Sequence, residues 1–230
     1  MMYPMLFDPT MLVLIPAILL TVYAQGKVKS SFAKYLQVPT RRGANGASVA
    51  RLLLDQNGLQ SVPVEPSQGR LSDHYDPRRR VLRLSPEVFR GSSVASVSVA
   101  AHEVGHAIQH ARGYVPLTIR TLLVPVASFG SSMAWVFIMG GLFIPDLAFL
   151  FDLGIYLFGA AVAFQVITLP VELNASRRAL RLLDTNGIIV AEEKRGARKV
   201  LQAAALTYVA AMAAALAQLV RLLLIRGRRR

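Results

Sequence analysis

The chain contains, at residues 92–110, the stretch SSVASVSVAAHEVGHAIQH, from which the rest of the sequence can be interpreted. Ser92 or Ser93 provides an N-cap at its start, because a side-chain oxygen there can accept a free backbone N–H. Gly113 follows as a stop signal. The pattern therefore predicts one helix over about 92–112.

Two histidines of this helix have the spacing of metal ligands. His102 and His106 are four residues apart and lie on one face, where both imidazoles can bind a single ion. Glu103 lies beside that face and is the expected general base. The alternative is that both histidines are core residues with ordinary hydrogen-bond partners and that the glutamate lies on the surface. The small and β-branched residues before His102 favour the metal site, because a buried helix can hold these polar groups only if they share a partner such as a divalent cation.

The composition indicates a membrane protein whose metal site lacks thiolates. Hydrophobic residues make up 53% of the 230 residues, and the mean hydropathy of +0.43 exceeds that of ordinary soluble domains. Cysteine is absent, which excludes thiolate ligands, disulfides and thiol catalysis. A Zn²⁺ ion must then be held by histidine and carboxylate.

The net charge of +13 has a membrane explanation. Lysines and arginines cluster beside the apolar segments, as the positive-inside rule predicts for cytoplasmic regions. No helix-turn-helix, zinc-finger or aromatic RNA-binding signature is present, so we expect no nucleic-acid partner.

Three or four membrane helices are predicted. Residues 1–24 form the first, with its N-terminus outside, because lysines follow the apolar run instead of preceding it. Residues 121–169 contain two charge-poor runs long enough for the second and third. Residues 201–230 form a C-terminal helix that either spans or lies in the interface. Against a span, Arg221 would lie within it and the basic tail would end outside, whereas an interfacial helix keeps the tail inside.

Residues 25–120 are predicted to form a cytoplasmic region of mixed α and β structure. Alternating polarity over about 61–84 indicates three short strands, and an edge strand of such a sheet can pair with an extended peptide. Asp73, His74 and Tyr75 form a polar cluster there. These residues either contact substrate and support the metal site, or are ordinary turn formers.

A zinc hydrolase site needs a third protein ligand and one open position. Glu172 is the best candidate, because the 170–200 segment returns to the side of the histidines after two crossings. His110 competes, but a continuous helix carries it about 12 Å from His102. The remaining carboxylates of this region lie in a stretch predicted to be exposed: Asp184, Glu192 and Glu193.

Three motifs carry a resemblance to a known family: DHYDP at 73–77, AAHEVGHAIQ at 100–109 and LPVELNASRRA at 169–179. With them the chain resembles the bacterial neutral zinc metallopeptidases, the YugP-like membrane proteins, over nearly its whole length. The resemblance implies a membrane-embedded zinc peptidase with both histidines of the second motif as ligands and Glu103 as base.

The chain is also distantly similar to the integral-membrane gluzincins, whose third ligand is a glutamate on a later helix. That glutamate is matched here by Glu172. Gluzincins often place an aspartate four residues further on, where this chain has Ser176. We therefore expect the hydrogen bond that orients a ligand imidazole to come from Ser176, Asn174 or an aspartate of the sheet region such as Asp73.

Together these features predict a mainly α integral membrane protein with a small α+β zincin-like catalytic domain. We expect a zinc metalloendopeptidase at the cytoplasmic face that cleaves membrane proteins or their exposed tails with a zinc-activated water, with Tyr75 or His74 near the oxyanion. Its partners are the lipid bilayer and a protein or peptide substrate. Two alternatives stay open: a non-catalytic membrane scaffold with structural zinc, and a basic module that binds membrane surfaces.

Overall fold

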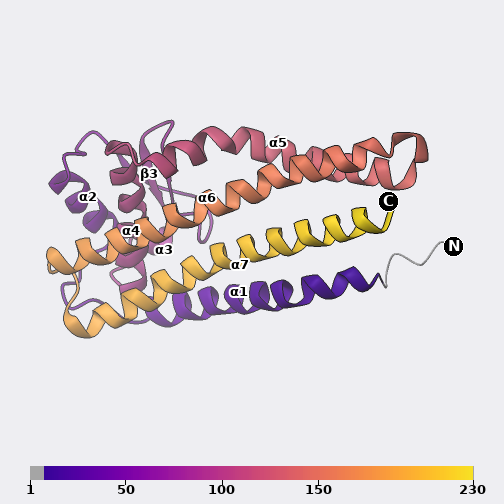
Figure 1. Ribbon diagram of the computed structural model, residues 1–230. Coiled ribbons are helices and arrows are strands. Elements are labelled where there is room, and N and C mark those ends of the chain that lie inside the picture. Colours follow the sequence, from indigo (N-terminus) through magenta and orange to yellow (C-terminus); the bar gives the residue numbers. More distant parts are fainter. Residues whose placement is uncertain (1–7, 230) are drawn as a thin grey trace. The chain divides into compact units, whose positions relative to one another are not determined.

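The computed structural model describes residues 8–229, with side chains to residue 228. Residues 1–7 of the predicted first membrane helix and Arg230 of the basic tail lie outside the described residues. The chain is mainly helical and carries one small sheet (Figure 1). It divides into two compact units, which are described one after the other.

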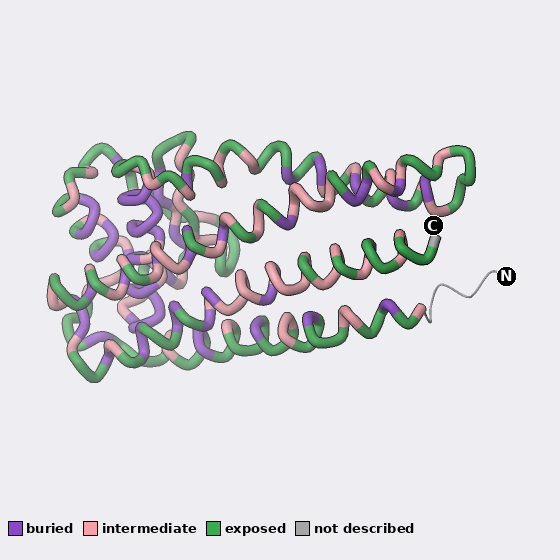
Figure 2. The backbone as a smooth tube through the Cα atoms, viewed as in Figure 1, coloured by how far each residue is buried: buried purple, intermediate pink, exposed green. Residues whose placement is uncertain are grey.

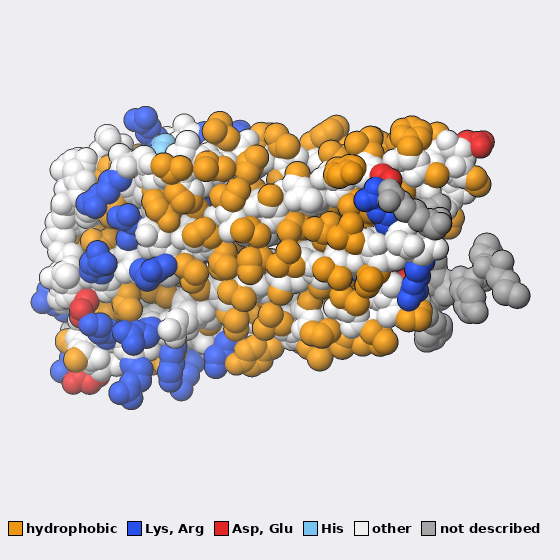
Figure 3. All heavy atoms as spheres, in the orientation of Figure 1, with side chains coloured by type: hydrophobic (Ala, Val, Ile, Leu, Met, Phe, Trp, Pro, Cys, Tyr) orange, Lys and Arg blue, Asp and Glu red, His pale blue; other side chains and the backbone are white. Residues whose placement is uncertain are grey.

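The first unit comprises the apolar parts of four long helices, from residues up to 24, 119–169 and 207 onward. Each helix is long and apolar enough to cross a membrane, so the described residues contain four candidate spans. Hydrophobic side chains cover the visible face of this unit, and many of its residues are exposed (Figures 2 and 3). The helices are α1 (Ile15–Leu36, after the 3-10 turn η2, Pro9–Leu14), α5 (Val115–Phe143), α6 (Phe149–Thr185, after η3, Pro145–Leu147) and α7 (Ala191–Arg229).

The basic end of α7 is paired with acids within this unit. Nε of Arg226 lies 2.7 Å from Oδ1 of Asp152, and Nη1 of Arg228 lies 3.1 Å from Oδ1 of Asp8. These ion pairs offset part of the positive charge that, in the sequence, weighs against a fourth span.

Two helices extend past the ends of the predicted spans. α1 was expected to end near residue 24 but runs to Leu36, because no proline follows until Pro39. α6 continues through Pro170 to Thr185, so Glu172 stands on the same helix as the third predicted span. The 170–200 segment is thus two helices, joined at a turn where Gly187 has a φ of +57°.

The second unit comprises residues 25–118 and 170–206. Its three-stranded sheet has the order β1-β3-β2, with β1 parallel and β2 antiparallel to β3, which confirms the predicted small sheet. The strands are shorter than the alternating segments. The elements are α2 (Gly46–Gln56), β1 (Val64–Pro66), β2 (His74–Asp76), β3 (Val81–Leu84), α3 (Pro86–Phe89) and α4 (Val94–Ala111).

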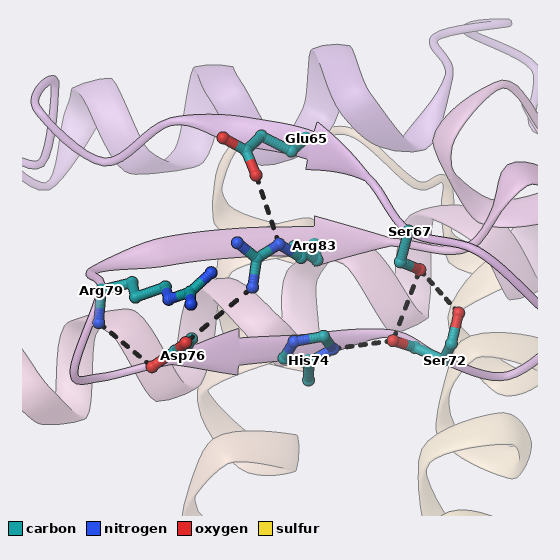
Figure 4. A network of polar contacts seen from close by, with 7 residues as sticks. All are labelled: Glu65, Ser67, Ser72, His74, Asp76, Arg79 and Arg83. Carbon is teal, nitrogen blue, oxygen red and sulfur yellow. Dashed lines mark hydrogen bonds and ion pairs between the residues drawn. The ribbon is translucent and has the colours of Figure 1, made fainter.

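A charged network covers the outer face of the sheet (Figure 4). Arg83 of the central strand lies between Glu65, at 3.2 Å, and Asp76, at 3.8 Å. His74 is exposed on the neighbouring strand, where its Nδ1 lies 2.8 Å from the carbonyl oxygen of Ser72. The network therefore links the three strands on the side away from their buried residues.

The predicted helix over about 92–112 is present as α4, and it forms the centre of the core. Ser93 caps its start by accepting the N–H of Ser96 at 3.1 Å, and Gly113 after its end has a φ of +60°. α4 packs against α2, α3, β2 and β3. Its apolar side chains join a cluster that includes Leu53, Leu84 and Leu183, all fully buried. Burying these side chains from water is the main stabilising contribution to the unit.

The expectation that Glu193 is exposed was wrong. Its carboxylate is buried and accepts two backbone N–H groups, from Arg41 at 2.7 Å and from Val190 at 3.0 Å. The carboxylate thereby satisfies an unpaired N–H at the start of α7 and fixes the loop after α1.

α4 and α6 cross closely at a glycine. A Cβ atom on Gly105 would lie 2.8 Å from the carbonyl oxygen of Ala175 and 3.2 Å from its Cα. Both contacts are with backbone, so no side-chain rotation could relieve them. The absence of a side chain at Gly105 lets the two helices approach.

We expect Gly105→Ala to lower the free energy of unfolding by about 1–3 kcal/mol, because the helices must separate to admit the methyl group. Gly26→Ala is the matched control, since its Cβ would meet no atom within 4 Å and alanine favours the helix. Thermal unfolding in detergent measures both. Equal melting temperatures for Gly105→Ala and the parent would contradict the close crossing.

Candidate metal centre

Three predicted ligands converge within the second unit. His102 and His106 face the same way from successive turns of α4, and Glu172 reaches them from α6. The two Nε2 atoms lie 3.1 Å apart. Oε2 of Glu172 lies 3.3 Å from Nε2 of His102 and 3.4 Å from Nε2 of His106. Among the described residues, these three form the group able to hold a metal ion.

These separations fit a tetrahedral zinc ion. Ligand atoms at about 2.0–2.1 Å from zinc stand roughly 3.3–3.4 Å from one another in a tetrahedron. Two imidazoles and one carboxylate are also a donor set of hydrolytic zinc sites, with the fourth position left open. Glu172 is 1% exposed, and a carboxylate so deeply buried needs a cationic partner. The residues present therefore fit zinc.

The second nitrogen of each imidazole is held in place. Nδ1 of His102 lies 3.2 Å from the Ser176 hydroxyl, and Nδ1 of His106 lies 3.0 Å from Oε1 of Gln109. When each Nδ1–H donates to these oxygens, the Nε2 lone pairs point to the shared centre.

Gln109, which was not among the predicted site residues, connects the two helices that carry the ligands. It is fully buried, and its amide donates to the carbonyl oxygen of Val171 at 2.8 Å and to Oδ1 of Asn174 at 3.0 Å. One side chain thus connects His106 on α4 with the backbone next to Glu172 on α6. In the sequence Gln109 is only a polar residue three positions after His106 on the same helix face, and its role becomes evident with its partners on α6.

Asn174 lies one contact further from the histidines than expected. Its Oδ1 accepts from Gln109 and also from Nε of Arg178, at 2.7 Å. Asn174 therefore fixes Gln109 and touches neither ligand imidazole by these bonds. Ser176 makes the direct contact, with His102.

Glu103 is buried beside the ligands, in an environment that favours its neutral form. Burial raises the pKa of its carboxyl to about 7, and the negative charges of Glu172 and Asp73 act in the same direction. His102 and a main-chain hydrogen bond at Tyr75 oppose the shift. A carboxyl with this pKa can take up and release a proton near neutral pH.

The polar cluster before β3 is divided between different surroundings. The Tyr75 hydroxyl lies 2.9 Å from Nδ1 of His110, which places His110 against β2 and away from the ligand cluster. Asp73 accepts hydrogen bonds from the backbone N–H of Ser85, at 2.7 Å, and from the Ser85 hydroxyl, at 3.0 Å. Burial raises the pKa of the Asp73 carboxyl. His74 remains exposed on the outer face. Their roles toward a substrate stay predictions.

Comparison with known proteins agrees with the chemistry of this donor set. Residues 10–227 match the family described as "Putative neutral zinc metallopeptidase". The chain is 51% identical over 211 residues to "Putative membrane protease YugP" of Bacillus subtilis (strain 168), covering 92% of this chain and 93% of that protein. No solved structure gives a significant match. Since the match extends over nearly the whole chain, the protein belongs to the family described as "Putative neutral zinc metallopeptidase".

Proposed function

We propose that this protein is a membrane-embedded zinc endopeptidase in which His102, His106 and Glu172 hold the metal and Glu103 is the general base. The observation that carries the proposal is the set of three ligand atoms 3.1–3.4 Å apart beside a buried carboxyl. Family membership and the similarity to "Putative membrane protease YugP" of Bacillus subtilis (strain 168) support the same activity.

The chain's own residues supply the proton transfer. Zinc, when bound, acts as a Lewis acid toward the peptide carbonyl and makes a water molecule more acidic. The Glu103 carboxylate accepts the proton of the attacking water and returns it to the nitrogen of the departing amine. Its pKa of about 7 suits both steps, since a stronger acid would hold the proton too weakly. Ser176 and Gln109 keep the two imidazoles oriented.

The sheet offers a way to hold the substrate. β2 is an edge strand, and the main chain at its residue Tyr75 is among the influences that lower the pKa of the Glu103 carboxyl. A peptide added along β2 would therefore run past the general base. Tyr75 is a better candidate than the exposed His74 for contact with the reacting carbonyl. The four candidate spans and the flanking positive charge support membrane proteins or their tails as substrates at the cytoplasmic face.

Removal of a ligand should release the metal. We expect Glu172→Ala to reduce bound zinc well below one ion per chain, because only two ligands remain. His110→Ala is the matched control and should retain the metal, since this histidine contacts Tyr75. Elemental analysis of the detergent-purified protein measures zinc per chain. Full occupancy in Glu172→Ala would exclude it as a ligand.

Glu103→Gln should strongly reduce catalysis while the metal stays bound. The amide keeps the size of the side chain but accepts no proton, so we expect casein or membrane-protein cleavage to fall about 10²–10⁴-fold. Zinc per chain should equal that of the parent. Unchanged cleavage would show that Glu103 is not the base, and no cleavage by either protein would favour a structural zinc site.

Gln109→Leu should weaken zinc binding about 10–100-fold, because Nδ1 of His106 loses its acceptor. Gln109→Glu retains an acceptor oxygen and should lose less affinity. Competition with a chelator measures the dissociation constant, and thermal unfolding of the zinc-free proteins shows whether the fold is kept. Equal affinities for all three proteins would exclude a positioning role for Gln109.

A further inference from the structure

A basic groove lies on the second unit, between α1 and α7 and apart from the candidate metal centre. Its volume is about 580 Å³. Residues from both helices line it: Lys27, Ser30, Ser31, Lys34, Tyr35, Lys199, Gln202, Ala203 and Leu206. Lysine and arginine side chains gather over this part of the surface (Figure 3).

The groove concentrates positive charge that no acid neutralises. Lys27, Lys34 and Lys199 supply three ammonium groups, and no carboxylate is among the lining residues. None of the ion pairs formed by the described residues includes these lysines. Like charges held around one hollow repel one another unless an anion lies between them. The groove is therefore suited to an anionic ligand.

The remaining lining residues supply hydrogen bonds and an apolar edge. Ser31 and Gln202 carry neutral donors, whereas the Ser30 hydroxyl donates to the carbonyl oxygen of Lys27 at 3.1 Å. Ser31 is only 8% exposed although it faces the groove. Ala203 and Leu206 form an apolar margin. A ligand with a charged group and an adjoining apolar part would match both kinds of surface.

The position of the groove along its helices indicates which anion this is. Lys27 follows Ala24, the last residue of the apolar part of α1, by three positions, a rise of about 4.5 Å. On α7, Lys199 is the last charged residue before an uncharged, mainly apolar run that begins at Val200 and includes Leu206. In a bilayer, residues just beyond an apolar span lie at the depth of the lipid headgroups.

We propose that this groove binds the phosphate of an anionic phospholipid, with the lipid's glycerol and first acyl carbons against Ala203 and Leu206. Lysine ammonium groups are compact charges that attract lipid phosphates at the membrane surface. Scattered positive-inside lysines would bind no particular lipid. Lys29, close in sequence but absent from the groove lining, represents that ordinary class.

Thermal unfolding of the full chain in non-ionic detergent tests the proposal. Short-chain phosphatidylglycerol at ten times its dissociation constant should raise the melting temperature by roughly 3–6 °C. Equal concentrations of short-chain phosphatidylcholine or inorganic phosphate should give no comparable shift. An equal shift with phosphatidylcholine would overturn the requirement for an anion, and an equal shift with inorganic phosphate would overturn the assignment to a lipid.

Two test variants and one control variant show whether the lipid binds in the groove. The triple substitution Lys27→Gln, Lys34→Gln and Lys199→Gln should lose the shift with phosphatidylglycerol. Its control carries the same loss of charge outside the groove: Lys29→Gln, Arg181→Gln and Arg195→Gln. Ser30→Trp keeps every charge but fills the groove, and it should also lose the shift in melting temperature with phosphatidylglycerol. If the triple variant unfolds, Ser30→Trp alone tests whether the groove is the binding site. Loss of the shift in the control, or its retention in Ser30→Trp, would overturn the proposed site.

Discussion

The close approach of α4 and α6 at Gly105 and Ala175 is the constraint on which the candidate metal centre depends. The histidines belong to one helix and the glutamate to the other, and a wider crossing would separate their ligand atoms. Gln109 adds a second connection, since its amide bonds the α6 backbone at 2.8 Å while its oxygen holds His106. Helix packing and hydrogen bonding thus both fix the distance between α4 and α6. A cation between these ligands would join the helices a third time.

The polar groups buried here are tolerated because each has a defined partner. Glu172 faces two imidazoles, both imidazoles have an oxygen at Nδ1, and the Gln109 amide is fully used. Glu103 differs, because burial raises its pKa to about 7 and so makes it responsive to protons near neutrality. The surroundings thus distinguish a carboxylate suited to metal binding from one suited to proton transfer.

Local spacing made part of this site predictable. The i, i+4 histidines and Glu103 follow from helix geometry alone, whereas Glu172 required counting membrane crossings to bring two distant segments together. Gln109 escaped prediction because a buried glutamine has no distinctive pattern until its partners on α6 are known. The crossing at Gly105 is equally invisible, since a glycine inside a helix does not reveal which backbone approaches it. Helix ends were misplaced for a related reason: polarity changes at the membrane boundary, but a helix continues until a residue breaks it.

The acids that pair with the arginines of α7 have a bearing on biogenesis. Asp8 and Asp152 precede α7 in the chain, so the ribosome delivers both counter-charges before it makes Arg226 and Arg228. A terminal segment with a basic end is costly to translocate by itself. The earlier segments can lower that cost by acting as an intramolecular template. For a candidate span such as α7, insertion into a bilayer would then depend on the order of synthesis as well as on hydrophobicity.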